Sequence, residues 1–330
     1  DEQKLEDFKN KVSAHYRDEK QLNDYKGIDT YGDFREMLSR SDIDGVIVAT
    51  PDHWHALASI AAANAKKHVY CEKPLSLTVV EGRAMVEAAR NNNIVFQTGS
   101  MQRSREQFHR AAELVANGYI GDIEKVVVSV GGPPDACDQP AEPTPANLNW
   151  DMWLGPAPER AYSSFFAPPL DWDGWARWRY CKEYGGGGMT DWGAHMFDIA
   201  QWALGMDNSG PVEVNPPDGK DYPVLTYVYA NGIPMTHEDF GRGNAVRFIG
   251  SEGTLDVSRS FLDMPESLKQ QAIGLNDKHL YKSPNHYYDW INCVKTGEKP
   301  ICDVEVGHRT ATVCNIGNIA YELGRPLKWN

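Results

Sequence analysis

Strands and helices alternate through the first 118 residues, and this alternation limits the fold more than any other feature of the chain. Three short, largely apolar runs are typical of strands buried on both faces of a parallel sheet: residues 44–50, 68–73 and 94–98. Helical patterns follow these runs in turn, over residues 55–65, 78–92 and 104–118. Parallel strands joined by helices form right-handed crossovers, so the pattern predicts a doubly wound parallel α/β domain.

The pattern changes after Gly121. We expect a strand over 123–130, then a stretch rich in Pro, Asp and Glu up to residue 158, and one strong helix over 190–205. Short strands with turns follow, over 222–230, 244–249 and 254–258. A final helix is expected over 303–323. The order of these strands and helices predicts an α+β domain with a large, mainly antiparallel open sheet and helices on one side.

Composition and charge narrow the classes of partner. No window approaches the roughly 20 consecutive apolar residues of a membrane-spanning helix. The formal net charge of −13 argues against a nucleic-acid partner, because binding to phosphates needs clustered cations. The six cysteines form no CxxC pair, so we expect free or buried thiols rather than disulfides or a zinc site. No signal peptide opens the sequence, and this is weak information about localisation.

The loop after the first strand, Ala49-Thr-Pro-Asp-His-Trp-His55, is the first candidate for a functional site. Ligands of open parallel sheets bind beyond the carboxyl ends of the strands, where this loop lies. The two histidines and Asp52 suggest a metal, but no further ligand stands at helical spacing, so we expect no metal. Asp52 could instead cap the following helix.

The second candidate is Glu72-Lys73-Pro74, at the carboxyl end of the next strand. A lysine there points into the same crevice, and partial removal from water would lower its pKa toward that of a general acid or base. The alternative is an ordinary surface ion pair. The position beside the first loop favours the functional interpretation.

The third candidate is the glycine-rich segment over 185–198. Its four glycines allow close approach of a backbone, and a helix follows at once. On that helix Asp191, His195 and Asp198 are spaced i, i+4 and i+7, which predicts that they share one face. An imidazole with a carboxylate one turn away can transfer protons. The alternative is that Asp191 caps the helix and His195 packs in the core.

An aromatic belt precedes this segment, with Trp172, Trp175, Trp178 and Tyr180 interleaved with two arginines. Aromatic faces stack on sugar rings, which favours a carbohydrate-like ligand, although core packing is the commoner use of tryptophan. No G-x-G-x-x-G follows a strand near the N-terminus, and phosphate-loop and nucleophile-elbow patterns are absent.

Four of these motifs, in this order, resemble the glucose–fructose oxidoreductase/inositol dehydrogenase (Gfo/Idh/MocA) family. The matching elements are Ala49-Thr-Pro-x-x-x-His55, Glu72-Lys-Pro74, Trp178-Arg179 and Gly186-Gly-Gly-x-x-Asp-x-x-x-His195. The likeness covers nearly the whole chain. The Asp52-His-Trp-His55 variant and the closing Glu305-Val-Gly-His308 look like a bacterial subgroup with many unassigned substrates and some exported members.

The resemblance implies a Rossmann-type dinucleotide-binding domain over 1–121 and a substrate-binding and oligomerisation domain over 122–330. It implies NAD or NADP as cofactor, a small carbohydrate or cyclitol as substrate, and a homo-oligomer formed through the C-terminal sheet. The implied catalytic set is Lys73, Asp191 and His195. The implied cofactor-binding residues are Thr50, Pro51, His53, His55, Glu72, Lys73 and Arg179. The implied substrate-binding residues are Arg103, Trp175, Trp178, Asp191 and His195.

The sequence departs from the family at its start. Family members begin with a strand, a glycine-rich turn and a helix, whereas Asp1-Glu-Gln-Lys-Leu5 looks like the segment after the second strand. We therefore expect a missing first segment and poor dinucleotide binding by the chain as given.

Three functions follow from this. The first is hydride transfer between a nicotinamide cofactor and a hydroxyl of a sugar, polyol or cyclitol. The second is redox-neutral, NAD-dependent glycoside cleavage on the same fold. The third is a catalytically silent sugar-binding module, because the phosphate-binding turn is absent.

Overall fold

The N-terminal half is built on a parallel sheet, as predicted. The computed structural model describes residues 1–22, 25 and 27–329. Three strands pair in the order β1-β2-β3: β1 (Gly45–Val48), β2 (His68–Cys71) and β3 (Phe96–Thr98). In register, Val46 lies beside Val69, and Val69 lies beside Phe96. All three side chains are buried, which is why these short strands are almost wholly apolar.

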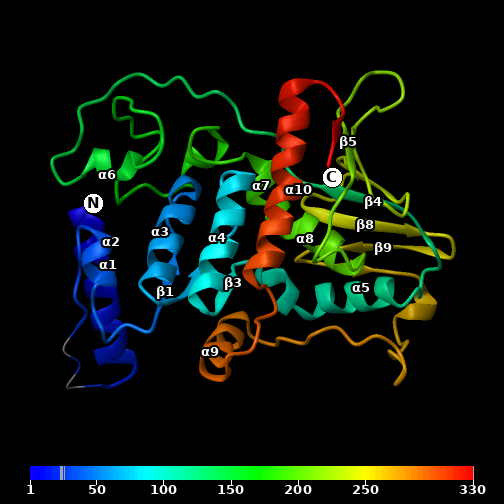
Figure 1. Ribbon diagram of the computed structural model, residues 1–330, viewed down its shortest axis with the longest axis horizontal. Helices are drawn as coiled ribbons and strands as arrows, with labels where there is room; N and C mark the ends of the chain where they lie inside the picture. The colour runs from blue at the N-terminus through cyan, green and yellow to red at the C-terminus, as the bar shows by residue number, and fades with distance from the viewer. Residues whose placement is uncertain (23–24, 26, 330) are drawn as a thin grey trace.

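Helices connect these strands in the right order for crossovers. α3 (Asp52–Asn64) leads from β1 to β2, and α4 (Val79–Asn92) leads from β2 to β3. The two helices lie side by side (Figure 1). Thr78 and Glu81 form the expected capping box at the start of α4, and Asn93 ends it in the left-handed conformation. Before β1 the chain forms α1 (Glu2–Ala14), one π-helical turn (His15–Glu19) and α2 (Phe34–Leu38).

The C-terminal half is built on a second, eight-stranded sheet in the order β10-β9-β8-β4-β7-β6-β5-β11. All neighbouring pairs are antiparallel except β4 with β7, which confirms the predicted mainly antiparallel sheet. The strands are β4 (Ile123–Ser129), β5 (Glu213–Asn215), β6 (Leu225–Val228), β7 (Pro234–His237), β8 (Ala245–Gly250), β9 (Gly253–Val257), β10 (Leu262–Asp263) and β11 (Leu327–Lys328). Formation of an oligomer through this sheet stays a prediction.

Helices pack on one side of the second sheet and form the larger core with it. They are α5 (Glu106–Ala116), α8 (Gly193–Ala203) and α10 (Val304–Leu323). Phe108 of α5, Phe197 of α8 and Val313 of α10 join the same buried cluster as Val126 and Phe248 of the sheet. The predicted domain boundary between residues 121 and 122 stays a prediction, and α5 packs across it on the second sheet.

One helix joins the two cores. α10 stands between the two sheets (Figure 1). Val304 and Ala311 belong to the core of the parallel sheet, whereas Val313 and Ile316 belong to the core of the second sheet. Because one rigid helix packs into both cores, it fixes the carboxyl edge of the parallel sheet against the helices of the second half. Among the helices of the described residues, none is long and apolar enough to cross a membrane.

Candidate active site

Lys73 reaches across the interface between the two halves. It follows β2, and the backbone N–H of Glu72 just before it donates to the carbonyl of Val48 at 2.9 Å. The Lys73 ammonium donates to Asp191 Oδ1 at 2.6 Å and to the Asp191 backbone carbonyl at 2.8 Å. The two side chains are 16% and 7% exposed. Two residues 118 positions apart therefore form one mostly buried ion pair at the carboxyl end of a parallel strand.

The glycine-rich segment positions Asp191 by close backbone packing. It leads into α7 (Gly188–Asp191), and a Cβ at Gly188 would collide with the backbone of Gly131. Gly187, just before α7, has φ +70°, a conformation that favours glycine. The expected single helix is in fact two, because α7 ends at Asp191 and α8 begins at Gly193.

His195 is buried on α8 beside these two residues. Its Nε2 lies 3.1 Å from a guanidinium nitrogen of Arg259, and its exposed fraction is 4%. Burial lowers its pKa well below the usual value, and the positive charges of Lys73 and Arg259 lower it further. The imidazole is therefore neutral near pH 7, and it can contribute a hydrogen bond rather than a charge.

Two further carboxyl groups surround the Lys73–Asp191 pair. Asp52 is buried at the start of α3, makes no capping hydrogen bond there, and has its pKa raised well above normal by burial. Lys73 and Asp191 lie close enough to Asp52 to affect its pKa. Burial also raises the pKa of Glu72. The expected role of Asp52 as a helix cap is not what the structure shows.

The histidines of the first loop, His53 and His55, are buried and contact backbone carbonyl groups. The two ring nitrogens of His55 lie 2.8 Å from the Pro74 carbonyl and 2.9 Å from the Thr50 carbonyl, and burial lowers its pKa to about 4. His53 contacts the Trp153 carbonyl at 3.0 Å and is 2% exposed. Both histidines are enclosed and support the loops on either side of Lys73, and their predicted role in binding cofactor stays a prediction.

Thr50 and Pro51, in contrast, are accessible at the carboxyl end of β1, where a ligand of the parallel sheet would lie. Their predicted role in binding cofactor stays a prediction, as does that of Glu72.

Arg103 is held by the carboxylates of Asp198 and Asp207, and its predicted role in binding substrate stays a prediction. Its guanidinium donates to Asp198 at 2.8 Å through two nitrogens and to Asp207 at 2.7 and 2.9 Å. Its side chain is 1% exposed, and Thr310 also donates to Asp198 at 3.0 Å. Four of its five N–H donors are thus already used within the protein.

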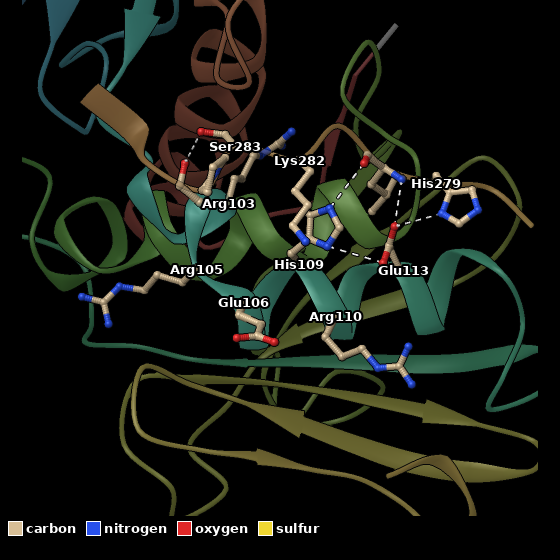
Figure 2. Close-up of a pocket in the computed structure, with 12 residues that line it drawn as sticks. Arg103, Arg105, Glu106, His109, Arg110, Glu113, His279, Lys282 and Ser283 are labelled. Carbon is tan, nitrogen blue, oxygen red and sulfur yellow. Dashed lines mark hydrogen bonds and ion pairs between the residues drawn. The ribbon is translucent and has the colours of Figure 1, made fainter. Parts of the chain in front are cut away.

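A cavity lies along α5, and its lining does not include Lys73 or Asp191. It has a volume of about 670 Å³ and lies between α5 and the segment over 279–284 (Figure 2). Its charged lining includes Arg105, Glu106, Arg110, Glu113 and Lys282. Glu113 accepts from the Leu280 backbone N–H at 3.1 Å, which ties this segment to α5. Among the described residues, no group of three His, Cys, Asp or Glu could hold a metal ion.

Arg179 connects the aromatic belt to the site. Its guanidinium carbon lies 4.1 Å from the Trp175 ring centre and 4.3 Å from the Trp178 ring centre, and its Nε is 3.8 Å from Asp191 Oδ1. Trp178 packs in a small core with Phe166 and is 8% exposed, and its predicted stacking on a sugar stays a prediction. Trp175 is 59% exposed, and its role in binding substrate stays a prediction.

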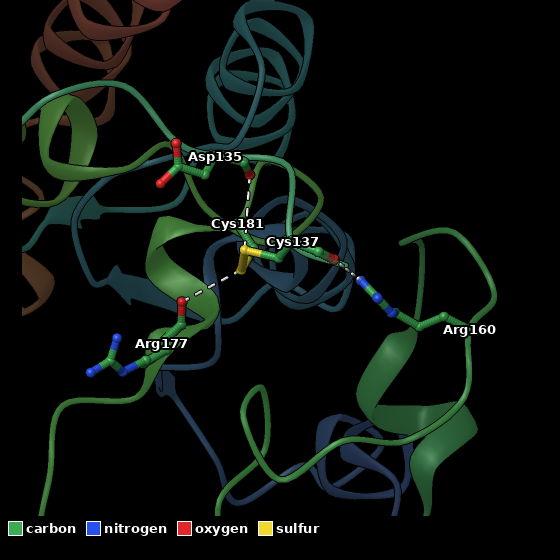
Figure 3. Close-up of a disulfide and its surroundings, with 5 residues drawn as sticks. All are labelled: Asp135, Cys137, Arg160, Arg177 and Cys181. Atoms are coloured by element: carbon green, nitrogen blue, oxygen red, sulfur yellow. Dashed lines mark hydrogen bonds between the residues drawn. A yellow bond between two sulfur atoms is a disulfide. The ribbon is translucent and has the colours of Figure 1, made fainter. Parts of the chain in front are cut away.

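A disulfide anchors the segment that carries Arg179, and this overturns the expectation of six free thiols. Cys137 and Cys181 are bonded, with Cα atoms 5.4 Å apart (Figure 3). Cys181 follows directly after the short 3₁₀ helix Arg177–Tyr180, and the Arg160 guanidinium donates to the Cys137 carbonyl at 3.0 Å. Sequence spacing could not reveal this pair, because the two cysteines are 44 residues apart and form no recognised spacing motif. The other cysteines are buried and free: Cys71, Cys293, Cys302 and Cys314.

Arg259 and Gln102 are site residues that the sequence analysis missed. Arg259 follows β9, and its guanidinium lies 4.5 Å from the Trp192 ring centre, beside His195. Gln102 is buried between His195 and Arg259. Neither belongs to a motif, and only the folding of the second sheet against α8 brings them together.

Both halves of the chain match family profiles of known proteins. Residues 2–100 match the profile described as oxidoreductase family, NAD-binding Rossmann fold, and residues 135–330 match oxidoreductase family, C-terminal alpha/beta domain. An uncharacterized oxidoreductase of Streptococcus pneumoniae is 41% identical over 88 residues, which is 27% of this chain and 24% of that protein.

A longer alignment joins the chain to myo-inositol 2-dehydrogenase of Thermotoga maritima. It is 26% identical over 306 residues, 84% of this chain and 77% of that protein. The structure of a levoglucosan dehydrogenase in complex with NADH and levoglucosan superimposes with a TM-score of 0.61 at 20% identity, over 91% of this chain and 83% of the other. At this identity the superposition shows the shared fold.

Proposed function

The chain belongs to the Gfo/Idh/MocA family of oxidoreductases, and we propose that it transfers a hydride between NAD or NADP and a hydroxyl group of a sugar, polyol or cyclitol. The observation that carries this proposal is the ion pair between Lys73 and Asp191 at the carboxyl end of β2, which links the two halves of the chain. The myo-inositol and levoglucosan dehydrogenases among its relatives support the class of substrate.

The residues at this edge fit a nicotinamide cofactor. Thr50 is exposed at the end of β1, and Glu72, directly after β2, is partly buried, which raises its pKa. A carboxyl group has about four lone-pair sites, so Glu72 is suited to accept a hydrogen bond from a ribose hydroxyl or an amide. When bound, the nicotinamide supplies the hydride acceptor or donor.

Lys73 is the group that handles the proton. An ammonium group has three N–H donors, and Asp191 takes two of them, which leaves one for a substrate oxygen. In carbonyl reduction Lys73 gives a proton to that oxygen, and in alcohol oxidation the neutral amine accepts the proton back. Asp191 holds the nitrogen in place through both its side chain and its backbone.

His195 serves the same oxygen or a neighbouring one as a neutral hydrogen-bonding group. Burial strongly lowers the pKa of its imidazole, so it stays neutral near pH 7. Arg179 Nε lies 3.8 Å from the same Asp191 oxygen that Lys73 contacts and adds positive charge there.

The test is to follow NADH and NADPH formation with a panel of sugars, polyols and cyclitols. We expect accumulation of reduced cofactor with at least one of them, and its loss in Lys73→Met. Release of aglycone from glycosides without net reduced cofactor would replace this proposal with redox-neutral glycoside cleavage. A failure of all substrates, together with tight binding of a sugar, would favour the silent binding module.

A further inference from the structure

Arg259 lies against the proposed catalytic histidine without an acidic partner. Its Nη2 is 3.1 Å from His195 Nε2, and its guanidinium packs over the Trp192 ring. Several other arginines are paired with carboxylates, as Arg83 is with Glu305 at 2.9 Å and Arg247 is with Asp256 at 2.8 Å. Within the described residues, the guanidinium of Arg259 forms no such ion pair.

The hydrogen-bond donors around His195 outnumber the acceptors. The Gln102 amide satisfies its neighbours when its nitrogen faces His195 Nδ1 at 2.9 Å and its oxygen faces Arg259 Nε at 2.9 Å. Arg259 can only donate, so both imidazole nitrogens face donors. A neutral imidazole carries one N–H, and that N–H meets another donor whichever nitrogen holds it. The cluster therefore lacks one hydrogen-bond acceptor.

Positive charge gathers at the same place. Arg105, at the start of α5, is close enough to Arg259 and His195 to lower the pKa of both. Its side chain extends away from the other labelled residues in Figure 2, with no dashed line to a partner. Neighbouring like charges destabilise one another. These two arginines lie near each other although the net charge of the chain is −13. The missing acceptor and the unpaired cations both call for a negatively charged oxygen group.

We propose, on the premise of the function given above, that the substrate carries an anionic group, a carboxylate or a phosphate, which Arg259 binds beside His195 with Arg105 adding positive charge. The anion accepts from the guanidinium and draws it away from His195 Nε2. The Nε2–H can then donate to an oxygen of the same ligand, while Nδ1 accepts from Gln102. This bound state removes the contact between two donors at His195 Nε2, and a planar guanidinium suits either anion.

Binding measurements can test this without turnover. We would titrate the protein, by calorimetry at low salt, with matched pairs of probes: D-glucuronate and D-glucose, D-galacturonate and D-galactose, and D-gluconate and D-sorbitol. Glucose 6-phosphate and galactose 6-phosphate distinguish a phosphate from a carboxylate. We expect the acidic member of at least one pair to bind about 10-fold or more tightly than its neutral partner.

Variants assign that preference to Arg259. In Arg259→Gln the acidic and neutral probes should bind within about 3-fold of each other, and in Arg105→Gln the preference should shrink but persist. Arg35→Gln, which removes an exposed arginine on α2, should keep the full preference. Equal binding within every pair, or an unchanged preference in Arg259→Gln, would overturn the proposal. Turnover of neutral sugars in that case would leave the proposed oxidoreductase function standing.

Discussion

The two ends of the α7–α8 unit each carry an ion pair between an aspartate and a distant cation, and the two pairs differ in exposure and in unused donors. At one end Asp191 pairs with Lys73, and seven residues later Asp198 pairs with Arg103. The first pair is 7% and 16% exposed and leaves one lysine N–H free, whereas the second is at most 1% exposed and leaves one of five arginine N–H groups free. A buried pair whose donors are nearly all used holds the fold together. A pair with a donor and some solvent access to spare can act on a ligand.

The largest expected effect separates the two pairs by stability. Arg103→Met leaves Asp198 and Asp207 without their cation, and an uncompensated buried charge costs about 3–5 kcal/mol. Denaturant unfolding of wild type and variant measures the loss. The control Arg35→Met removes an exposed arginine and should change the free energy of unfolding by less than about 1 kcal/mol. A loss below about 1 kcal/mol in Arg103→Met would erase the distinction between the two ends.

The segment that supports the Asp191 end should depend on its disulfide. Replacing both Cys137 and Cys181 with serine should lower the free energy of unfolding by about 2–4 kcal/mol, because the cross-link limits a long loop in the unfolded chain. Arg179 lies two residues before Cys181, so the affinity for substrate should fall as well. Reducing agent should shift the unfolding of wild type toward that of the double variant. If reducing agent leaves the unfolding of wild type unchanged, the disulfide contributes nothing to the free energy of unfolding.

Substitution of Lys73, at the other end, should lower activity rather than stability. Lys73→Met should lower turnover by at least ~10²-fold, about 2.7 kcal/mol, because it removes an acid/base group, while cofactor affinity stays nearly unchanged. Steady-state kinetics and a cofactor titration measure the two quantities. Lys66→Met, at an exposed lysine bonded to Asn92, serves as control. Undiminished turnover would remove Lys73 from the mechanism.

The smallest effect comes from the buried histidine beside the Arg103 end. His286 contacts Ser104 and the Thr98 carbonyl, and burial lowers its pKa to about 4. Its unfolded pKa is near 6.5, so only the unfolded chain takes up this proton between pH 6.5 and about 4. The stability that His286 contributes is thus complete above pH 6.5 and is lost as pH falls, by at most about 1.4 kcal/mol per pH unit.

Unfolding measured across this pH range in wild type and His286→Asn checks the sign. The variant should show a flatter decline toward acid, and His15→Asn, on the remote π-helical turn, should follow wild type. A steeper decline in His286→Asn would contradict the assignment of a neutral buried imidazole.

Much of the fold and part of the site followed from local pattern. The alternation of apolar strand and helix predicted the parallel sheet, and the positions of Lys73 after a strand and Asp191 after the glycines predicted their approach. The same spacing also placed Asp191, His195 and Asp198 on one face. It could not show that α7 ends at Asp191, which lets Asp191 and Asp198 serve different partners.

The sequence by itself determined which residue types stand at strand ends and helix starts, because these depend on neighbours within a few positions. Only the tertiary structure decided which charges are free to act. Arg103 is neutralised by acids about 100 residues away, His55 is enclosed by two loop carbonyls, and Arg259 reaches His195 of α8 from the segment after β9. Burial and hydrogen-bond pairing are set by such distant contacts, and they distinguish the fully buried Arg103–Asp198 pair from the partly exposed Lys73–Asp191 pair.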